Sequence, residues 1–275
     1  MAGGERQGAA RVAPSWRGLD GAVVAVAAAI GAALVYLRVR HGVGVSPDSL
    51  AYLAMADRIA DSPRAILRPG TAPIVSALNH WSPLTGVVLA ATRGLGSDPY
   101  VRARWVSTVG GAVLAAATFA FARRHASRAV AVVAVAVVLV SPELLADLGS
   151  LNSEALYYPL LAVGLLAADL GLAGRTPRPR WIAVAGVAGL LATMARFVGL
   201  ALPAGMVVAS VALWRGPERR RATGAVVAFA LVPTLVWYLA YGTDRRPAFD
   251  PQFGRIRQVV RSIARYVVPE RLLAG

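Results

Sequence analysis

The residues best suited to chemistry gather in one polar segment, His41 to Trp81, of a chain that is otherwise mostly apolar. Asp48, Asp57 and Asp61 lie in this segment, although the whole chain of 275 residues has only 14 acidic residues. A carboxylate near an apolar surface can have a raised pKa and can act as a general base or as a metal ligand. Asp57 and Asp61 fit the solvated face of a short helix, and Asp48 fits the first turn of that helix.

A second polar segment, SPELLADLGSLNSE, holds Glu143, Asp147 and Glu154. Glu154 follows Asn and Ser at a predicted helix start, as Asp48 follows Ser and Pro, and the helix dipole alone favours an acid at both positions. Asp48 and Glu154 together could hold a divalent metal ion through their oxygens. Three separated histidines and no cysteine offer no other set of metal ligands.

Three arginines are candidates for binding a phosphate, because a guanidinium offers paired donors to an anion. Arg196 is the only charge in the 34-residue stretch from Trp181 to Trp214, and Arg102 and Arg104 lie just before an apolar run. Anchoring at the membrane interface is the alternative role for all three, and for Arg102 and Arg104 it is the preferred interpretation. Tyr52, His80 and Trp81 are candidates for lining a substrate pocket, and the two last residues also suit an aromatic belt.

The amino-acid composition indicates which fold class positions these residues. Hydrophobic residues make up 57% of the chain, charged residues 16%, and the mean hydropathy is +0.57. Several uncharged runs approach the roughly 20 residues that cross a bilayer as a helix. The chain is therefore predicted to be an all-α polytopic membrane protein. The net charge of +15 is explained by arginines in cytoplasmic loops, so we expect no nucleic-acid partner.

We predict about seven transmembrane helices with a cytoplasmic N-terminus, because the clusters of arginines should face the cytoplasm. The predicted spans are 21–37, 105–122, 129–145, 155–172, two short helices that meet near Arg196 within 181–214, and 222–241. Under this topology the candidate acids and Arg196 lie on the outer side.

Ser46-Pro47-Asp48 is typical of a helix start, and the apolar residues after it predict a short helix at the membrane interface. Residues 83–92 are apolar but short, and they are predicted to lie on the outer leaflet. The chain thus divides into a cytoplasmic tail (1–18), a membrane module (19–241) with an outer loop (38–104), and a basic amphipathic tail on the outer face (242–275).

A series of motifs resembles the membrane module of the GT-C superfamily of glycosyltransferases. The motifs are SPDSLAYLAMADRIA, HWSPL, RARWVSTVGGAVLAAATFAFARR, SPELLADLGSLNSEALYYPLLAVGLLAADL and AGLLATMARFVGLALP, in this order. The members that the chain resembles are the protein O-mannosyltransferases and the lipid A aminoarabinose transferase. Family members usually continue with more spans, so we expect this chain to correspond to a truncated, N-terminal module.

The resemblance implies a hexosyl- or pentosyltransferase that uses a polyprenyl-phosphate sugar as donor. Asp48 would be the catalytic base and Glu154 would assist it, with Glu143 and Asp147 as rivals within the pocket. Arg196, helped by Arg102 and Arg104, would bind the donor phosphate. The implied location is the plasma (inner) membrane with an extracytoplasmic active face, where a glycan, a lipid or a protein would be the acceptor.

Two other classes of function remain open. A non-catalytic or truncated membrane protein that binds or flips a lipid-linked sugar would not need the outer acids. A small transporter would need ionisable residues near the middle of the membrane. Only Asp169 and Arg196 are candidates for that role, and both lie near the ends of predicted spans.

Overall fold

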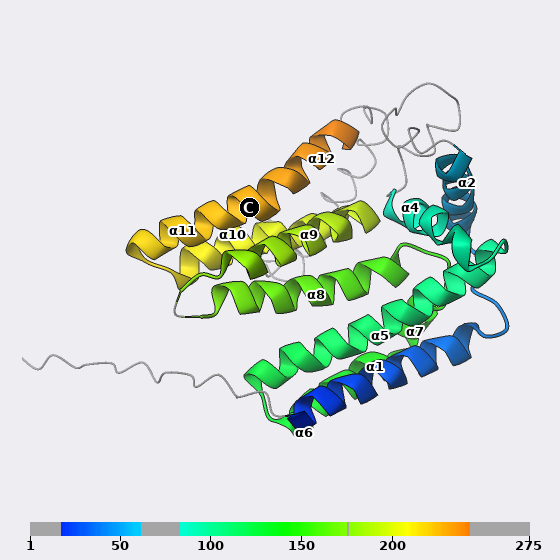
Figure 1. The fold of residues 1–275 in the computed structure, drawn as a ribbon, viewed down its shortest axis with the longest axis horizontal. Helices are drawn as coiled ribbons and strands as arrows, with labels where there is room; N and C mark the ends of the chain where they lie inside the picture. The colour runs from blue at the N-terminus through cyan, green and yellow to red at the C-terminus, as the bar shows by residue number, and fades with distance from the viewer. Residues whose placement is uncertain (1–17, 62–82, 175, 243–275) are drawn as a thin grey trace, which may run out of the picture.

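The computed structural model describes residues 18–61, 83–174 and 176–242 (Figure 1). In these ranges the regular elements are helices, joined by one isolated bridge between Gly44 and Ser150, which confirms the all-α prediction. In chain order the elements are α1 (Gly18–Val39), α2 (Pro47–Asp61), α4 (Leu84–Ala91), η2 (Thr92–Leu95), α5 (Pro99–His125), α6 (Arg128–Val140), α7 (Pro142–Leu148), α8 (Glu154–Leu172), α9 (Pro179–Ala195), η3 (Phe197–Leu200), α10 (Ala201–Leu213), α11 (Gly216–Val226), η4 (Val227–Leu231) and α12 (Val232–Gly242).

The described residues contain four helices that are long and apolar enough to cross a bilayer: Asp20–Val39, Pro99–His125, Glu154–Leu172 and Gly216–Leu239. The bent pair of α6 and α7 makes a fifth if the two are one span. Pro179–Ala195 and Phe197–Leu213 are apolar but shorter. These lengths support a membrane protein with four to five clear spans, and the count of seven depends on the two shorter segments.

The predicted span 129–145 is not one helix. It stops at Val140, and α7 continues at an angle of 65°. Pro142 cannot donate a backbone N–H, and the residue before a proline avoids the helical region. Ser141 is accordingly extended (ψ 117°), and its hydroxyl accepts a hydrogen bond from the Leu144 amide at 3.4 Å. Glu143 and Asp147 therefore lie on a short helix rather than in a loop.

The 34-residue apolar stretch folds as two helices that meet at Arg196, as predicted. Arg196 is extended (φ −150°, ψ 134°) between the end of α9 and the start of η3. The chain turns tightly there, since a Cβ placed on Gly199 would lie 2.4 Å from the carbonyl carbon of Ala192. The break leaves the guanidinium of Arg196 at the end of α9 instead of within an apolar helix.

Small residues let the long helices pack closely. A Cβ at Gly31 of α1 would lie 2.5 Å from the carbonyl oxygen of Gly111 in α5, and one at Gly110 would lie 2.5 Å from the carbonyl oxygen of Ala155 in α8. A Cβ at Gly186 of α9 would come within 2.1 Å of the carbonyl oxygen of Phe229. Van der Waals packing through small residues of this kind is typical of helices inside membranes.

The bundle has two chemically different ends (Figure 1). At the end that we name the α2 end, α2 and α4 lie beside the start of α5, the start of α8 and the last turns of α9. We name the opposite end the basic end, because the helices there begin or finish with arginines, namely Arg123, Arg124, Arg128, Arg178, Arg180, Arg215, Arg219, Arg220 and Arg221.

Two acids, one buried and one partly buried, pair with the basic residues of the basic end. The carboxylate of Asp20 is 2% exposed, and it pairs with Arg123 at 3.3 Å and with Arg128 at 3.1 Å. Asp169 of α8 pairs with Arg124 and lies 3.2 Å from the Nε2 atom of His125. These contacts tie α5 to its neighbours α1, α6 and α8 at one level.

Candidate functional site

The segment before α2 is fixed against the loop that precedes α8. The amide of Gly44 donates to the carbonyl of Gly149, and the amide of Leu151 donates to the carbonyl of Gly44, both at 2.8 Å. The hydroxyl of Ser49 donates to the carbonyl of Leu151 at 2.8 Å. These bonds join two segments about a hundred residues apart in the sequence, and they give the start of α2 a defined position over the start of α8.

Side chains complete this joint and orient Asp48. The hydroxyl of Ser46 donates to the side-chain oxygen of Asn152 at 2.8 Å, and it also accepts from the Ser49 amide at 3.4 Å. Ser46 is thus a helix cap, as the sequence predicted, and Pro47 begins α2. Asp48, one residue into the helix, is partly buried, and no ion pair to it is formed within the described residues.

Five side chains meet at this joint: Asp48, Tyr52, Ser153, Glu154 and Arg196. We call them the polar cluster. Tyr52 follows Asp48 by one helical turn, so both lie on one face of α2. Tyr52 shares a hydrogen bond with the Ser153 side chain and feels the charges of Asp48 and Arg196. The hydroxyl of Ser153 donates in turn to Glu154 at 3.2 Å, and Glu154 is paired with Arg196.

Tyr52 lies at the centre of the polar cluster and is 3% exposed. Burial raises the pKa of its hydroxyl above the ordinary value of 10.0; the hydrogen bond with Ser153 lowers it, the negative charge of Asp48 raises it, and the positive charge of Arg196 lowers it. The phenol therefore stays neutral over the physiological range and can donate a hydrogen bond.

Glu154 of α8 and Arg196 at the end of α9 form an ion pair. The carboxylate of Glu154 accepts from both Arg196 and Ser153 and is 15% exposed. Both of its oxygens are therefore engaged by neighbouring side chains. Arg196 is 42% exposed and keeps donors that face outward. Asp48 is thus the better candidate base, and Glu154 positions Arg196.

Arg102 is a buried cation next to the polar cluster. It is 3% exposed, its Nη1 atom donates to the carbonyl of Leu89 at 2.6 Å, and its Nε atom is buried without a hydrogen-bond partner. No carboxylate within the described ranges pairs with it. Leu89 and Ala103 pack in the same core cluster as Tyr52, which links this arginine to the site. The Nε atom of Arg104 is buried without a partner as well.

An apolar groove begins beside these residues. Its volume is about 340 Å³, and it lies between α4, α5 and α8. Trp105, Val106, Val109 and Val113 line it from α5. Arg102 precedes Trp105 by three residues on the same helix, and it is not among the residues that line the groove. From α8 the lining begins at Leu156, two residues after Glu154.

Several of the predicted site residues lie away from the polar cluster. Glu143 is exposed and bonds to the Ser141 hydroxyl at 3.2 Å, and Asp147 accepts from the Tyr158 hydroxyl at 2.7 Å. Asp57 and Asp61 both pair with Arg93 on the surface, which agrees with the solvated face predicted for them. His80, Trp81 and the predicted amphipathic tail lie outside the described residues.

The described residues do not fit the predicted metal site on Asp48 and Glu154. They contain no group of three His, Asp or Glu side chains that could hold an ion. Glu154 is already paired with a cation, so of the two predicted ligands Asp48 alone is left to bind a metal. We therefore derive no step through a metal.

The sequence alone did not single out Ser46, Ser49, Asn152 and Ser153 as a joint. A signal was present, because SPDS and SLNSE are serine-rich segments that adjoin the candidate acids Asp48 and Glu154. Pairing them needs the fold, since nothing in either segment specifies the other.

Comparison of the chain with models of known families, with curated proteins and with solved structures finds no match.

Proposed function

We propose that this protein is a membrane glycosyltransferase of the GT-C type, which moves a sugar from a polyprenyl-phosphate donor to an acceptor hydroxyl. The observations that support the proposal are the polar cluster at the α2 end and the apolar groove between α4, α5 and α8, whose lining begins on α8 at Leu156. The groove suits an isoprenoid chain, Arg102 and Arg196 suit the phosphate, and Asp48 suits the reacting hydroxyl. Few other classes of ligand combine a long apolar chain, a phosphate and a group that reacts with a hydroxyl.

In the proposed reaction the acceptor oxygen attacks the anomeric carbon of the sugar. Its proton passes to the carboxylate of Asp48, which is the general base. The bond between that carbon and the phosphate oxygen breaks, and the leaving phosphodiester becomes a phosphate monoester with more negative charge. Arginine donors stabilise this added charge. The neutral hydroxyl of Tyr52 can hold the sugar or the phosphate by donating a hydrogen bond.

Glu154 keeps Arg196 in place before the donor arrives. Arg196 is 42% exposed, so an incoming phosphate can reach its outward donors while Glu154 stays bonded to the inner ones. This arrangement gives Glu154 a positioning role and leaves proton removal to Asp48. It also predicts that Arg196→Lys binds the donor less tightly, because lysine lacks the planar pair of donors.

The proposed topology has seven crossings, with the α2 end outside and the basic end in the cytoplasm. The basic clusters support it through the positive-inside rule. The chain has no cysteine, so single substitutions report their side without background. Leu50→Cys, at an exposed position of α2, should react with an impermeant thiol reagent in intact cells, and Thr176→Cys at the basic end should not. The reverse pattern would place the polar cluster on the wrong side.

The decisive experiment measures sugar transfer by the full chain in liposomes that contain polyprenyl-phosphate sugars of several kinds. Asp48→Asn should lower the rate by about 100- to 10,000-fold, the usual contribution of a positioned base. Donor affinity should not change, because the base acts on the acceptor. Asp61→Asn is the matched control on the same helix and should keep the parental rate, since Asp61 is 76% exposed. Transfer by Asp48→Asn at the parental rate would eliminate the proposed base.

A second candidate is a protein that binds or flips a lipid-linked sugar without chemistry. The groove and the arginines favour it as much as they favour the enzyme, because neither feature needs a base. The same liposomes separate the two functions. A flippase moves donor across the membrane at the parental rate in Asp48→Asn and gives no new glycosidic bond in any variant.

A further inference from the structure

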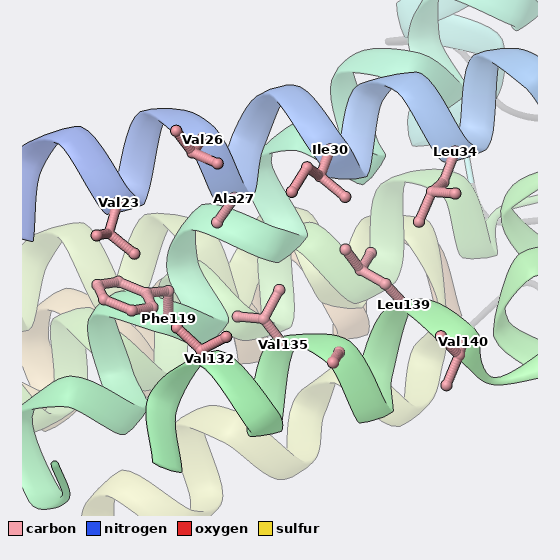
Figure 2. A pocket seen from close by; sticks show the side chains of 11 residues that line it. Val23, Val26, Ala27, Ile30, Leu34, Phe119, Val132, Val135, Leu139 and Val140 are labelled. Carbon is pink, nitrogen blue, oxygen red and sulfur yellow. The ribbon is translucent and has the colours of Figure 1, made fainter. Parts of the chain in front are cut away.

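A second apolar groove lies between α1, α5 and α6, with a volume of about 230 Å³ (Figure 2). In Figure 2 side chains of α1 and α6 face one another across it, and Phe119 of α5 lies between Val23 and Val132. The lining is almost wholly apolar. The groove is separate from the polar cluster, so its role does not depend on the proposed glycosyltransferase function.

The length of the groove limits what can occupy it. On α1 the lining runs from Val23 to Leu34, and on α6 from Val132 to Val140. At 1.5 Å per residue these runs cover about 16 Å and about 12 Å. The hydrocarbon core of a bilayer is about 30 Å thick, so the groove spans about half of it. A transmembrane helix of a partner would need the full thickness, whereas one acyl chain of a phospholipid needs only one leaflet.

Charged residues stand at one end of the groove, on all three helices. Asp20 precedes Val23 by three residues, Arg123 follows Phe119 by four, and Arg128 precedes Val132 by four, so each lies one turn beyond the lining on the same face. The carboxylate of Asp20 is buried, while the side chains of Arg123 and Arg128 are 19% and 38% exposed. Among the described residues, these two cations and one anion leave a net charge of +1 at the groove's end.

The two arginines keep donors for a further anion. Arg128 bonds to Asp20 through Nε and Nη2, both at 3.1 Å. Arg123 uses Nε for Asp20 and Nη1 for the carbonyl of Ala126, both at 3.3 Å. Within the described ranges neither Nη1 of Arg128 nor Nη2 of Arg123 donates to a protein acceptor. Both nitrogens have the geometry that binds phosphate oxygens.

We propose that this groove binds an anionic phospholipid. Its phosphate contacts Arg128 and Arg123, and one of its acyl chains fills the groove between α1 and α6. The net charge of +1 balances a headgroup of charge −1, so a phosphatidylglycerol-type lipid is preferred over a zwitterionic one. Basic residues at the level of the headgroups favour anionic lipids by about fivefold for each charge.

The test titrates the purified full chain in detergent with dioleoyl phosphatidylglycerol or dioleoyl phosphatidylcholine and counts bound lipids by native mass spectrometry. The parent should bind one phosphatidylglycerol about fivefold more tightly than phosphatidylcholine. Ala136 lines the groove at an exposed position of α6, so the ring in Ala136→Phe should fill part of the groove. Binding of both lipids should weaken by roughly tenfold for every two acyl-chain methylenes that the ring displaces. Arg128→Gln should keep acyl-chain binding and lose the preference for phosphatidylglycerol.

Val137→Phe is the matched control, because Val137 is the next residue, is 63% exposed and does not line the groove. It should bind both lipids as the parent does, with the same melting temperature as Ala136→Phe. Three results would overturn the proposal: no preference for phosphatidylglycerol in the parent, unchanged binding in Ala136→Phe, or an equal loss in Val137→Phe. A protein partner released by Ala136→Phe with lipid affinity unchanged would also overturn it and assign the groove to that partner.

Discussion

The ion pair between Glu154 and Arg196 allows the sharpest test of how the site is built. We consider Glu154→Gln, Arg196→Gln and the double variant, with the melting temperature of the full chain in detergent as the measurement. The side chain of Glu154 is 15% exposed and that of Arg196 is 42% exposed. Exposed pairs contribute about 0.2–1 kcal/mol, whereas breaking a buried pair costs about 3–5 kcal/mol. Since solvent screens Arg196, we expect a coupling energy of about 1 kcal/mol.

The two single changes should differ, because they leave different groups behind. Glu154→Gln leaves an arginine that water can reach, so we expect a loss of about 1 kcal/mol. Arg196→Gln leaves a largely buried carboxylate without its cation, and we expect a loss of about 2 kcal/mol. With about 2–4 °C per kcal/mol for a chain of this size, the melting temperature should fall by about 2–4 °C and about 4–8 °C. The double variant should be no less stable than Arg196→Gln.

The surface pair of Arg93 and Asp57 supplies the control cycle. Its side chains are 43% and 66% exposed, so solvent screening should reduce the coupling to a few tenths of a kcal/mol. Unfolding is followed by the fluorescence of the six tryptophans. If the effects of Glu154→Gln and Arg196→Gln add to within about 0.3 kcal/mol, the pair does not form and the positioning role of Glu154 is refuted.

Three further results are expected. Gly186→Ala should lower the melting temperature by overpacking of about 1–3 kcal/mol, because its Cβ meets the Phe229 carbonyl at 2.1 Å, while Gly205→Ala, with nothing within 4 Å, should not. Asn152→Ala should cost about 1 kcal/mol and speed amide exchange in residues 44–49, while Asn152→Asp keeps the acceptor for Ser46 and should behave as the parent. Tyr52 has a folded-state pKa raised above 10.0. Its contribution to stability is therefore complete below pH 10 and is lost as the pH rises through the raised pKa. Above pH 10 the melting temperature should therefore fall less steeply with pH in Tyr52→Phe than in the parent.

Hydropathy was sufficient to predict a helical membrane protein, because lipid leaves the backbone few alternatives to the helix. Local signals also placed the start of α2 at Ser46-Pro47 and the break at Arg196. The bend at Ser141 was missed, although Pro142 is visible in the sequence, because α6 and α7 together read as one apolar run. A proline inside a membrane helix does not always break it, and Pro159 lies within α8.

The candidate site was predicted in part. Asp48, Tyr52, Glu154 and Arg196 were all expected to lie in it, and they do meet. The ion pair between Glu154 and Arg196 was not predictable, since it depends on how α8 packs on α9. Sequence spacing carries no information on which acid meets which arginine over a separation of 42 residues. Glu143 and Asp147 were expected in the same pocket, and the bend at Ser141 puts them on a separate helix, α7.

The joint between Gly44 and Ser150 has a consequence for how the protein is made. A ribosome delivers α1 and α2 to the membrane long before α8 and α9 exist, and chains fold broadly from the N-terminus as they emerge. Until Leu151 and Asn152 arrive, Ser46 and Ser49 bond to each other and lack their bonds to the segment before α8. The two halves of the polar cluster are thus synthesised about a hundred residues apart and become one site only when α8 and α9 insert. A nascent chain arrested before α8 would carry Asp48 in an unanchored helix, and a separately expressed second half, added in trans, would be the natural way to dock it.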